Sequence, residues 1–304
     1  MGIVESLRAP ERADVERWAW AAVVANIVIV LTGGLVRLTD SGLGCPTWPR
    51  CTDSSFVPHR ALGVHGVIEF GNRMLTYVLI AVVIATFVAV WRWAGTTREL
   101  RRLAALIAFG VPFQGVIGGI TVLTDLNPWV VSLHMILSML LVAASMLLVV
   151  RVRGANHVVW PAYAKQVVLA TYVVLWAAVY LGTMVTGAGP HAGDADAPRN
   201  GLDPHIMSHV HAASVYVLVA LTVAACVLLR RTPAARIAGI LLLVELAQGT
   251  IGFVQYFTDL PIALVAIHLV GAAALIAGGT RLLVTTVSSA QPRSATEALD
   301  HHPA

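Results

Sequence analysis

The chain has 304 residues, of which 58% are hydrophobic and only 12% are charged, and its formal net charge is +4. This composition excludes an ordinary water-soluble domain, because apolar stretches of about 20 residues separated by short polar links are typical of membrane-spanning helices. The small positive charge follows from membrane topology, so binding to nucleic acid is not expected.

Eight apolar stretches occupy nearly the whole chain, centred near residues 28, 78, 111, 140, 175, 218, 246 and 273. Fifteen of the twenty Lys and Arg residues then fall on one side of the membrane, namely Arg8, Arg12, Arg17, Arg92, Arg98, Arg101, Arg102, Arg151, Arg153, Lys165, Arg230, Arg231, Arg236, Arg281 and Arg293. Basic residues concentrate in cytoplasmic loops. We therefore expect an all-α, multi-pass protein of the plasma membrane with eight transmembrane helices and both termini in the cytoplasm.

The first span ends in the segment TGGLVRLTDSGLGCPTWPRC, residues 32–51, which contains Arg37, Cys45 and Cys51 and leads into the first outer loop. The outer face of a bacterial membrane is oxidising, so a disulfide between the two cysteines is allowed there. Such a pair is either a structural staple or a redox-active pair facing a catalytic site. Zinc binding is less favoured, because only two thiols are present.

The second span opens with HGVIEFGNRMLTY, residues 65–77. His65, Glu69 and Asn72 fall on one face of a helix, and Arg73 lies beside them. Ionisable groups at membrane depth must face the interior of a bundle and be paired. One interpretation is a Glu–Arg pair that only locks helices together. We favour a ligand or catalytic cluster, because a locking pair requires neither the histidine nor the asparagine.

The third and fourth spans are repeated in the seventh and eighth. Residues 114–134 align with residues 248–268 at a constant offset of 134, without a gap, and nine of twenty-one positions are identical. Both copies contain Gln-Gly-x-Ile-Gly, then Thr-Asp-Leu, then a histidine, His134 or His268. Two halves of four helices each enter the membrane in the same sense, which predicts two four-helix bundles related as a parallel repeat. The expected divisions are a cytoplasmic tail 1–16, a first half 17–153, a second half 154–287 and a cytoplasmic tail 288–304.

The sixth span starts at PHIMSHVHAASVY, residues 204–216. Aligned with the second span, it places His211 at the position of Asn72. His134 is then expected opposite Asn72, and His268 opposite His211, all in the outer leaflet. A single histidine of this kind is more often a helix-packing residue, but two repeat-related histidines favour metal ligation. Bis-histidine ligation of heme in a four-helix bundle fits this pattern, and zinc does not, because no Cys, Asp or Glu cluster accompanies the pair.

The two halves are not equivalent. The second half has both histidines and is expected to hold heme permanently, whereas the first has His134 opposite Asn72. A heme in the first half is expected to be five-coordinate or ligated by His65, and therefore replaceable. A heme whose two axial positions are both filled suits electron transfer, whereas a heme with a free or exchangeable axial position suits a substrate. Glu69 is the candidate for proton transfer, and Arg37 and Arg73 are candidate partners for heme propionates.

The chain resembles the heme A synthase family, whose members convert heme O to heme A for cytochrome oxidase. The resemblance extends over nearly the whole chain. It rests on the duplicated eight-helix layout, the GGLVRLTDSGLGCPTWPRC and IEFGNR segments, the two Gln-Gly-x-Ile-Gly helices and the histidines of the fourth, sixth and eighth spans.

The resemblance assigns roles to particular residues. It implies that His211 and His268 hold a heme b cofactor, that the first half holds the substrate heme O, and that Glu69 is essential. It also matches Cys45 and Cys51 to the family's paired outer cysteines. This sequence departs from the family at Asn72, where the usual residue is histidine.

The expected reaction is oxidation of the C8 methyl group of heme O to a formyl group by successive hydroxylation with loss of water. A heme O synthase is the expected supplier, cytochrome oxidase the recipient, and the electron donor is unidentified. Two other functions remain open. One is a di-heme electron-transfer protein, and the other is a non-enzymatic heme carrier or oxidase assembly factor.

Overall fold

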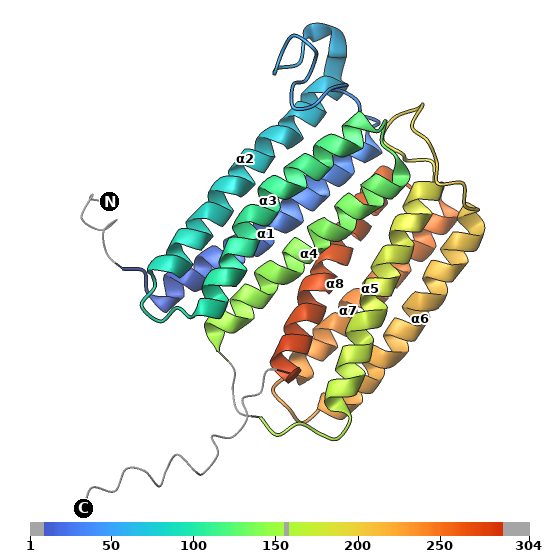
Figure 1. The fold of residues 1–304 in the computed structure, drawn as a ribbon. Helices are drawn as coiled ribbons and strands as arrows, with labels where there is room; N and C mark the ends of the chain where they lie inside the picture. Colours follow the sequence, from blue (N-terminus) through green and yellow to red (C-terminus); the bar gives the residue numbers. More distant parts are fainter. Residues whose placement is uncertain (1–8, 155–157, 288–304) are drawn as a thin grey trace, which may run out of the picture.

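The computed structural model describes residues 9–154 and 158–287, and this part of the chain contains eight long helices and no strand (Figure 1). The helices are α1 (Arg12–Leu38), α2 (Gly63–Arg92, preceded by the short 3₁₀ helix η2, Arg60–Leu62), α3 (Arg98–Leu123), α4 (Pro128–Arg153), α5 (Ala164–Ala188), α6 (Pro204–Leu229), α7 (Ala235–Phe257) and α8 (Ile262–Val287). All eight are long and apolar enough to cross a membrane. The prediction of an all-α protein with eight spans is therefore confirmed.

The centres of the eight helices lie close to those expected from the sequence, but α1 begins earlier than the predicted division at residue 17. This helix begins at Arg12, within the predicted tail, because the Asp14 side chain accepts a hydrogen bond of 3.0 Å from the backbone N–H of Glu11 and so caps the first turn. The remaining parts of the predicted tails, residues 1–8 and 288–304, lie outside the described residues.

Caps set the starts of three other helices. Thr97 accepts a hydrogen bond from the backbone of Leu100 at the start of α3. Asn127 and Asp203 do the same at the starts of α4 and α6, and in both cases proline follows as the first helical residue. Proline is favoured there because its missing N–H would have no partner in the helix.

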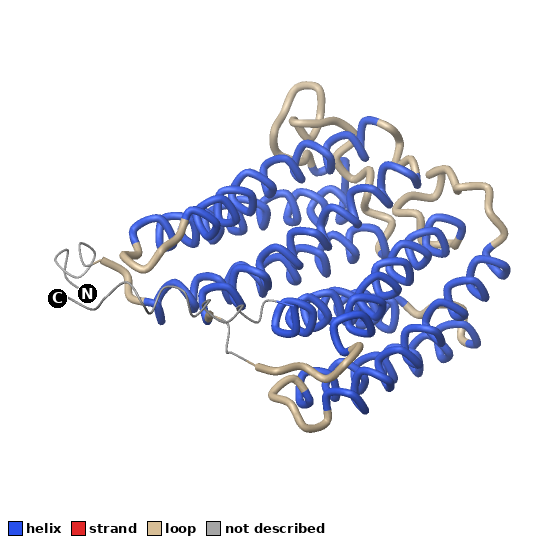
Figure 2. Tube along the Cα trace, turned by 60° about the horizontal axis from the view of Figure 1, so that its bottom comes forward, coloured by secondary structure: helices blue, strands red, loops and turns tan. Residues whose placement is uncertain are grey.

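The helices form two groups of four. In the first group α1 contacts α2 and α4, and α3 contacts the same two helices; in the second group α5 contacts α6 and α8, and α7 contacts the same two. Among the described residues, α2 and α4 do not contact each other, nor do α6 and α8. These helices therefore occupy diagonal corners of their groups. Figures 1 and 2 show the two groups side by side, with the helices running along a common direction.

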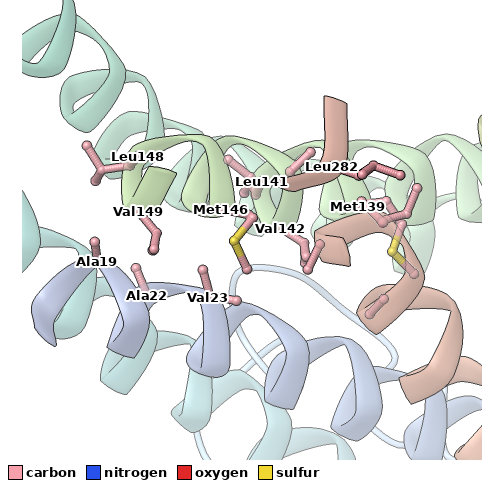
Figure 3. Packing of buried hydrophobic residues seen from close by; sticks show 14 of the residues in the cluster. Ala19, Ala22, Val23, Met139, Leu141, Val142, Met146, Leu148, Val149 and Leu282 are labelled. Atoms are coloured by element: carbon pink, nitrogen blue, oxygen red, sulfur yellow. The ribbon is translucent and has the colours of Figure 1, made fainter. Parts of the chain in front are cut away.

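The two groups meet along α1, α4, α5 and α8. Figure 3 shows the core beside this contact. Small residues of α1, among them Ala19 and Ala22, face Met146 and Val149 of α4 within the first group, and Leu282 of α8, from the second group, belongs to the same buried cluster. Small residues allow helices in a membrane to approach closely, which increases van der Waals contact. Asn26 of α1 adds a polar link by donating hydrogen bonds to the Ala22 carbonyl and, at 3.3 Å, to the Ser145 hydroxyl of α4.

The turns that join α3 to α4 and α7 to α8 have the same backbone conformation. In both, the Asp-Leu pair of the repeated Thr-Asp-Leu sequence has positive φ: 51° and 58° at Asp125 and Leu126, and 52° and 55° at Asp259 and Leu260. Residues other than glycine adopt such angles at a cost of about 1–2 kcal/mol each. The same costly conformation thus occurs at matching positions in the two turns. In both copies the histidine then lies six residues after the first residue of its helix.

Candidate functional site

The histidine-bearing helices of the second group face each other across its diagonal. His211 lies on α6 and His268 on α8. Both helices pack against α5 and α7, while among the described residues they do not contact each other. The two side chains are nevertheless close enough to interact electrostatically. Two imidazoles thus approach from opposite corners of a four-helix bundle, an arrangement that can enclose a cofactor.

The His211 ring is oriented by the neighbouring helix α5. Its Nδ1 atom lies 3.0 Å from the backbone carbonyl oxygen of Ala178. A carbonyl can only accept a hydrogen bond, so Nδ1 carries the proton and Nε2 keeps its lone pair. This is the arrangement found in metal-ligating histidines, where a carbonyl or carboxylate fixes the ring through the nitrogen that does not bind metal.

The rings of His134 and His268 lack the hydrogen bond that holds His211. Both side chains are partly buried, and the Nδ1 atom of each is buried without a hydrogen-bond partner among the described residues. A buried polar atom without a partner is uncommon and calls for an explanation, such as a ligand or a bound water. Both rings therefore lie in surroundings that a polar or metal-containing ligand would complete.

A glycine faces each of the four positions that the sequence analysis aligned. In every case the glycine lies on the helix immediately before the one that carries the aligned residue. A β-carbon added to the glycine would contact the side chain of that residue. The pairs are Gly33 with Asn72, Gly118 with His134, Gly182 with His211 and Gly252 with His268, at 3.9, 3.3, 3.3 and 3.8 Å from the added carbon to the nearest side-chain atom. Glycine at these positions leaves the side chains free to turn toward the centre of each group.

Asn72 is held by the first helix. Its Oδ1 atom accepts a hydrogen bond of 2.8 Å from the Thr32 hydroxyl of α1. The amide oxygen is thus engaged, and the amide nitrogen has no lone pair suited to metal binding. In the first group, His134 on α4 is consequently the side chain with metal-ligating chemistry at this depth.

His65 lies near the start of α2, at the end of the first group that carries the loop between α1 and α2. It is exposed, and its Nδ1 atom is 3.0 Å from the Ser41 hydroxyl. It precedes Asn72 by seven residues on α2, which corresponds to about 10 Å along the helix axis. The structure therefore places these two residues at different depths, although they share a helix face as predicted.

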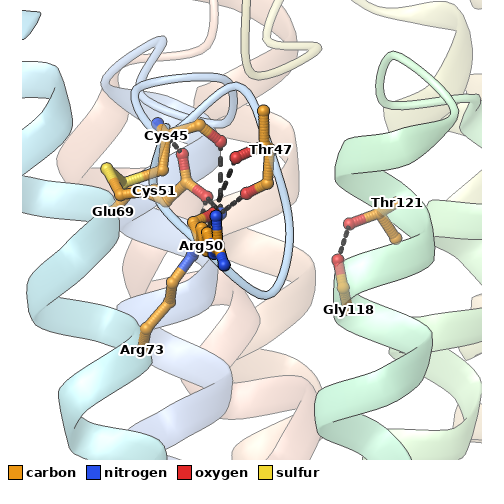
Figure 4. Close-up of polar contacts among 8 residues, drawn as sticks. All are labelled: Cys45, Thr47, Arg50, Cys51, Glu69, Arg73, Gly118 and Thr121. Carbon is orange, nitrogen blue, oxygen red and sulfur yellow. Dashed lines mark hydrogen bonds and ion pairs between the residues drawn. A yellow bond between two sulfur atoms is a disulfide. The ribbon is translucent and has the colours of Figure 1, made fainter. Parts of the chain in front are cut away.

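Glu69 and Arg73 form one network with the loop between α1 and α2 (Figure 4). Glu69 is only 5% exposed, and it accepts hydrogen bonds from the Cys45 backbone N–H at 2.6 Å and from Arg73. Arg73 also donates to the backbone carbonyls of Cys45, Thr47 and Arg50 at 3.0–3.1 Å. The carboxylate and the guanidinium thus pair with each other, as predicted, and together they fix the loop to α2.

The same loop reaches the neighbouring helix α3. A disulfide joins Cys45 to Cys51, which confirms that the two cysteines form a bridge. Between them, the Trp48 ring lies directly against Gly119, where an added β-carbon would overlap it. Gly119 follows the glycine that faces His134. The bridged loop therefore spans one end of the first group, from the start of α2 to the end of α3.

Arg37 links the two groups instead of pointing at the first. Its guanidinium donates hydrogen bonds to the carbonyl oxygens of Thr186, at 2.9 Å, and His191, at 2.6 Å. His191 in turn contacts the carbonyl of Leu260 at 3.0 Å through its Nε2 atom. Both arginines that were expected near propionates are thus bound to backbone carbonyls.

Three features of the site were not predicted from the sequence: the glycines at positions 33 and 182, the Ala178 carbonyl and the Thr32 hydroxyl. The glycines had a visible sequence signal, because LGTMVTGAG at the end of the fifth span weakly repeats the glycine-rich end of the first. The carbonyl and the hydroxyl had none, since their roles depend on how adjacent helices are rotated.

Comparison with known proteins gives consistent matches. Residues 16–279 match the model of a family described as cytochrome oxidase assembly protein. A heme A synthase of Lysinibacillus sphaericus is 33% identical over 177 residues, 56% of this chain and 57% of that protein. Heme A synthases of Halalkalibacterium halodurans and Listeria monocytogenes are each 27% identical, over 53% and 55% of this chain and 56% and 57% of theirs. The matched part thus covers a little over half the length of these relatives.

Proposed function

The chain belongs to the cytochrome oxidase assembly protein family, and from this premise we propose that it is a heme A synthase of the plasma membrane. The proposed reaction oxidises the C8 methyl group of heme O to the formyl group of heme A. The observation that carries the proposal is the diagonal pair His211 and His268, each facing a glycine, together with a matching set of positions in the first group that has one histidine only.

The proposed architecture is a parallel repeat of two four-helix bundles, residues 17–153 and 154–287, with both termini in the cytoplasm. The matching helix neighbours in the two groups and the matching Asp-Leu turns support the repeat. The distribution of basic residues supports the orientation.

The second bundle is the proposed site of heme b, held through Nε2 of His211 and an imidazole nitrogen of His268. The carbonyl-bound Nδ1 of His211, the unpartnered His268 ring and the two facing glycines fit this group. A heme iron with two imidazole ligands takes up and passes on single electrons. Bound in this way, the iron would be held by two histidines of the chain, which would leave no coordination position for a substrate.

A glycine-to-alanine variant tests the second bundle. In Gly182→Ala, the new methyl carbon would come within 3.3 Å of the His211 ring. Tilting the ring away costs about 1 kcal/mol, so we expect about fivefold weaker heme retention and a shifted heme absorption band. Gly249→Ala is the control, because no heavy atom lies within 4 Å of its added carbon. Equal heme retention in both variants would argue against close packing of the ring.

The first bundle is the proposed site of the substrate heme O, with His134 as the axial ligand. Of the two opposite ligands expected from the sequence, water is favoured over His65, because His65 is exposed, contacts the Ser41 hydroxyl and lies about 10 Å along the helix axis from Asn72. Glu69 is proposed to move protons or to stabilise positive charge that develops on the substrate. Its position at the base of the bridged loop, next to the cationic Arg73, supports a site at the outer end of this bundle.

Asn72→His tests the proposed coordination of the substrate. The variant restores the residue usual in the family, which would place a second imidazole opposite His134. We expect the first-bundle heme to become six-coordinate, with a changed absorption spectrum and slower turnover, because substrate release then requires breaking another bond. An unchanged spectrum and turnover would mean that coordination at this position does not matter.

Pigment analysis tests the function as a whole. The chain is expressed with a heme O synthase, purified, and its hemes are extracted and separated. Heme A, with hydroxylated intermediates, is the expected result. Heme B alone would favour a di-heme electron-transfer protein, and bound heme O without any oxidised product in the presence of reductant and oxygen would favour a heme carrier. The proposed partners are a heme O synthase, cytochrome oxidase and an unidentified electron donor.

A further inference from the structure

A buried carboxyl group lies between α6 and α7, away from the groups discussed so far. Glu245, on α7, is 1% exposed. Its Oε1 atom accepts a hydrogen bond of 2.8 Å from the Thr222 hydroxyl of α6, while its Oε2 atom is buried with no partner among the described residues. Leaving a carboxyl oxygen unsatisfied is destabilising, so packing alone does not explain this residue.

In the first bundle the corresponding helix contact contains no such polar pair. The offset of 134 residues that aligns α7 with α3 pairs Glu245 with Val111. The offset of 139 residues that aligns His211 with Asn72 pairs Thr222 with Val83. Both valines are buried, at 1% and 0% exposure. The polar pair is therefore confined to the bundle that is proposed to hold heme permanently, and it is replaced as a pair in the other.

Contacts along α7 and α8 place Glu245 relative to the histidine. Gly252 faces the His268 ring, the Gln248 side chain lies against Gly271, and Leu241 faces Gly278 further in. Glu245 is three residues before Gln248 and seven before Gly252, which puts it about 10 Å along the helix from the level of the ring. Gln248 lies between the two.

Between Glu245 on α7 and His268 on α8, three buried polar atoms have no hydrogen-bond partner in the described chain: Oε2 of Glu245, Oε1 of Gln248 and Nδ1 of His268. The corresponding Gln114 also has a buried Oε1 atom without a partner in the described chain, but its amide nitrogen donates hydrogen bonds to the His134 carbonyl and to the Ser138 hydroxyl. Ala272 occupies the position of Ser138 in the second bundle. The Gln248 amide is therefore free to bind water, and buried waters commonly satisfy such atoms.

Few other ionisable groups face Glu245. From α6, the Cys226 thiol is close enough to interact with it electrostatically. On α8, the ionisable groups are His268 on the outer side and Arg281 toward the inner end, where Arg281 interacts with Arg153 and Arg236. Glu245 is thus the group best placed to exchange a proton near the level of the second-bundle ligands.

We propose that Glu245 is a proton acceptor coupled to the redox change of the second-bundle heme, with Gln248 holding the waters between them. When a single-electron donor reduces that heme, Glu245 takes up one proton from the aqueous phase, forming one O–H bond, and it releases the proton on reoxidation. The added electron and the added proton balance, so the charge of the buried site stays constant. The inference rests on the proposed function, because it requires heme in this bundle.

The test is a redox titration of the purified, heme-loaded protein with mediator dyes at several pH values. Proton uptake on reduction makes the midpoint potential fall as pH rises, and we expect this in the unaltered protein. In Glu245→Gln, the amide oxygen can still accept the Thr222 hydrogen bond, but the side chain cannot take up a proton, so the pH dependence is expected to disappear. A redox-induced infrared band of a protonated carboxyl group should disappear with it.

Two controls separate this role from a structural one. Thr222→Val removes the hydrogen bond and keeps the carboxyl group, so it should retain the pH dependence. The double variant Glu245→Val/Thr222→Val reproduces the valine pair of the first bundle and should fold, bind heme and lose the dependence. A heme-loaded Glu245→Gln protein that keeps the original dependence, or an unaltered protein that has none, overturns the inference alone. A preparation without heme overturns the proposed function as well.

Discussion

Replacement of His268 by alanine is expected to remove most of the heme from the second bundle. The iron would lose one of its two axial nitrogens, and the shortened side chain would leave space where the ring now lies against Gly252. Loss of groups that only support a metal ligand typically weakens metal binding about 10–100-fold, so loss of the ligand itself should weaken it at least about tenfold. The measurement is the ratio of heme to protein after purification, and His211→Ala should have the same effect.

The matched control is His209→Ala. His209 is exposed, and its Nδ1 atom contacts the backbone carbonyl of His205 on its own helix at 2.7 Å, so it is a histidine of α6 outside the proposed site. It should keep the original heme content. Addition of free imidazole should partly restore heme to His268→Ala. If heme content were the same in the alanine variants of residues 209, 211 and 268, the assignment of the axial ligands would be wrong.

Glu69→Gln is expected to abolish most of the conversion of heme O to heme A while leaving second-bundle heme in place. General acid–base groups contribute about 10²–10⁴-fold to the reaction rate. The amide of glutamine can neither take up or release a proton as a carboxyl group does nor carry a negative charge. It can still accept the hydrogen bond from the Cys45 N–H, so the outer loop should remain attached. The measurement is heme A formed per bound heme O under turnover conditions.

Arg73→Met separates chemistry from anchoring. Arg73 holds three loop carbonyls as well as Glu69, so its removal loosens the loop more than Glu69→Gln does. If Glu69 acts on the substrate, Glu69→Gln should lose more activity than Arg73→Met, and Arg73→Met should be the less stable protein. Greater loss of activity in Arg73→Met would instead identify the Glu–Arg pair as a lock on the loop.

Most of the fold could be predicted from the sequence, because the length of the apolar stretches and the positions of the basic residues determine where helices cross a membrane. It also located the histidines, since the internal repeat aligned His134 with His268 without a gap. What it could not provide were contacts between distant segments. Arg37 looks like a propionate partner until the loop after α5 is seen to occupy its guanidinium. Glu69 looks like a membrane-buried acid until the Cys45 backbone is seen to reach it.

The packing of α4 against α8 has a consequence for how electrons would travel. These two helices carry His134 and His268, one from each bundle, and packed helices have axes about 8–10 Å apart. The two proposed porphyrins would thus lie on either side of a single helix–helix seam. An electron delivered to the second-bundle heme would therefore reach the substrate heme by crossing α4 and α8 alone, with no further helix between the two porphyrins.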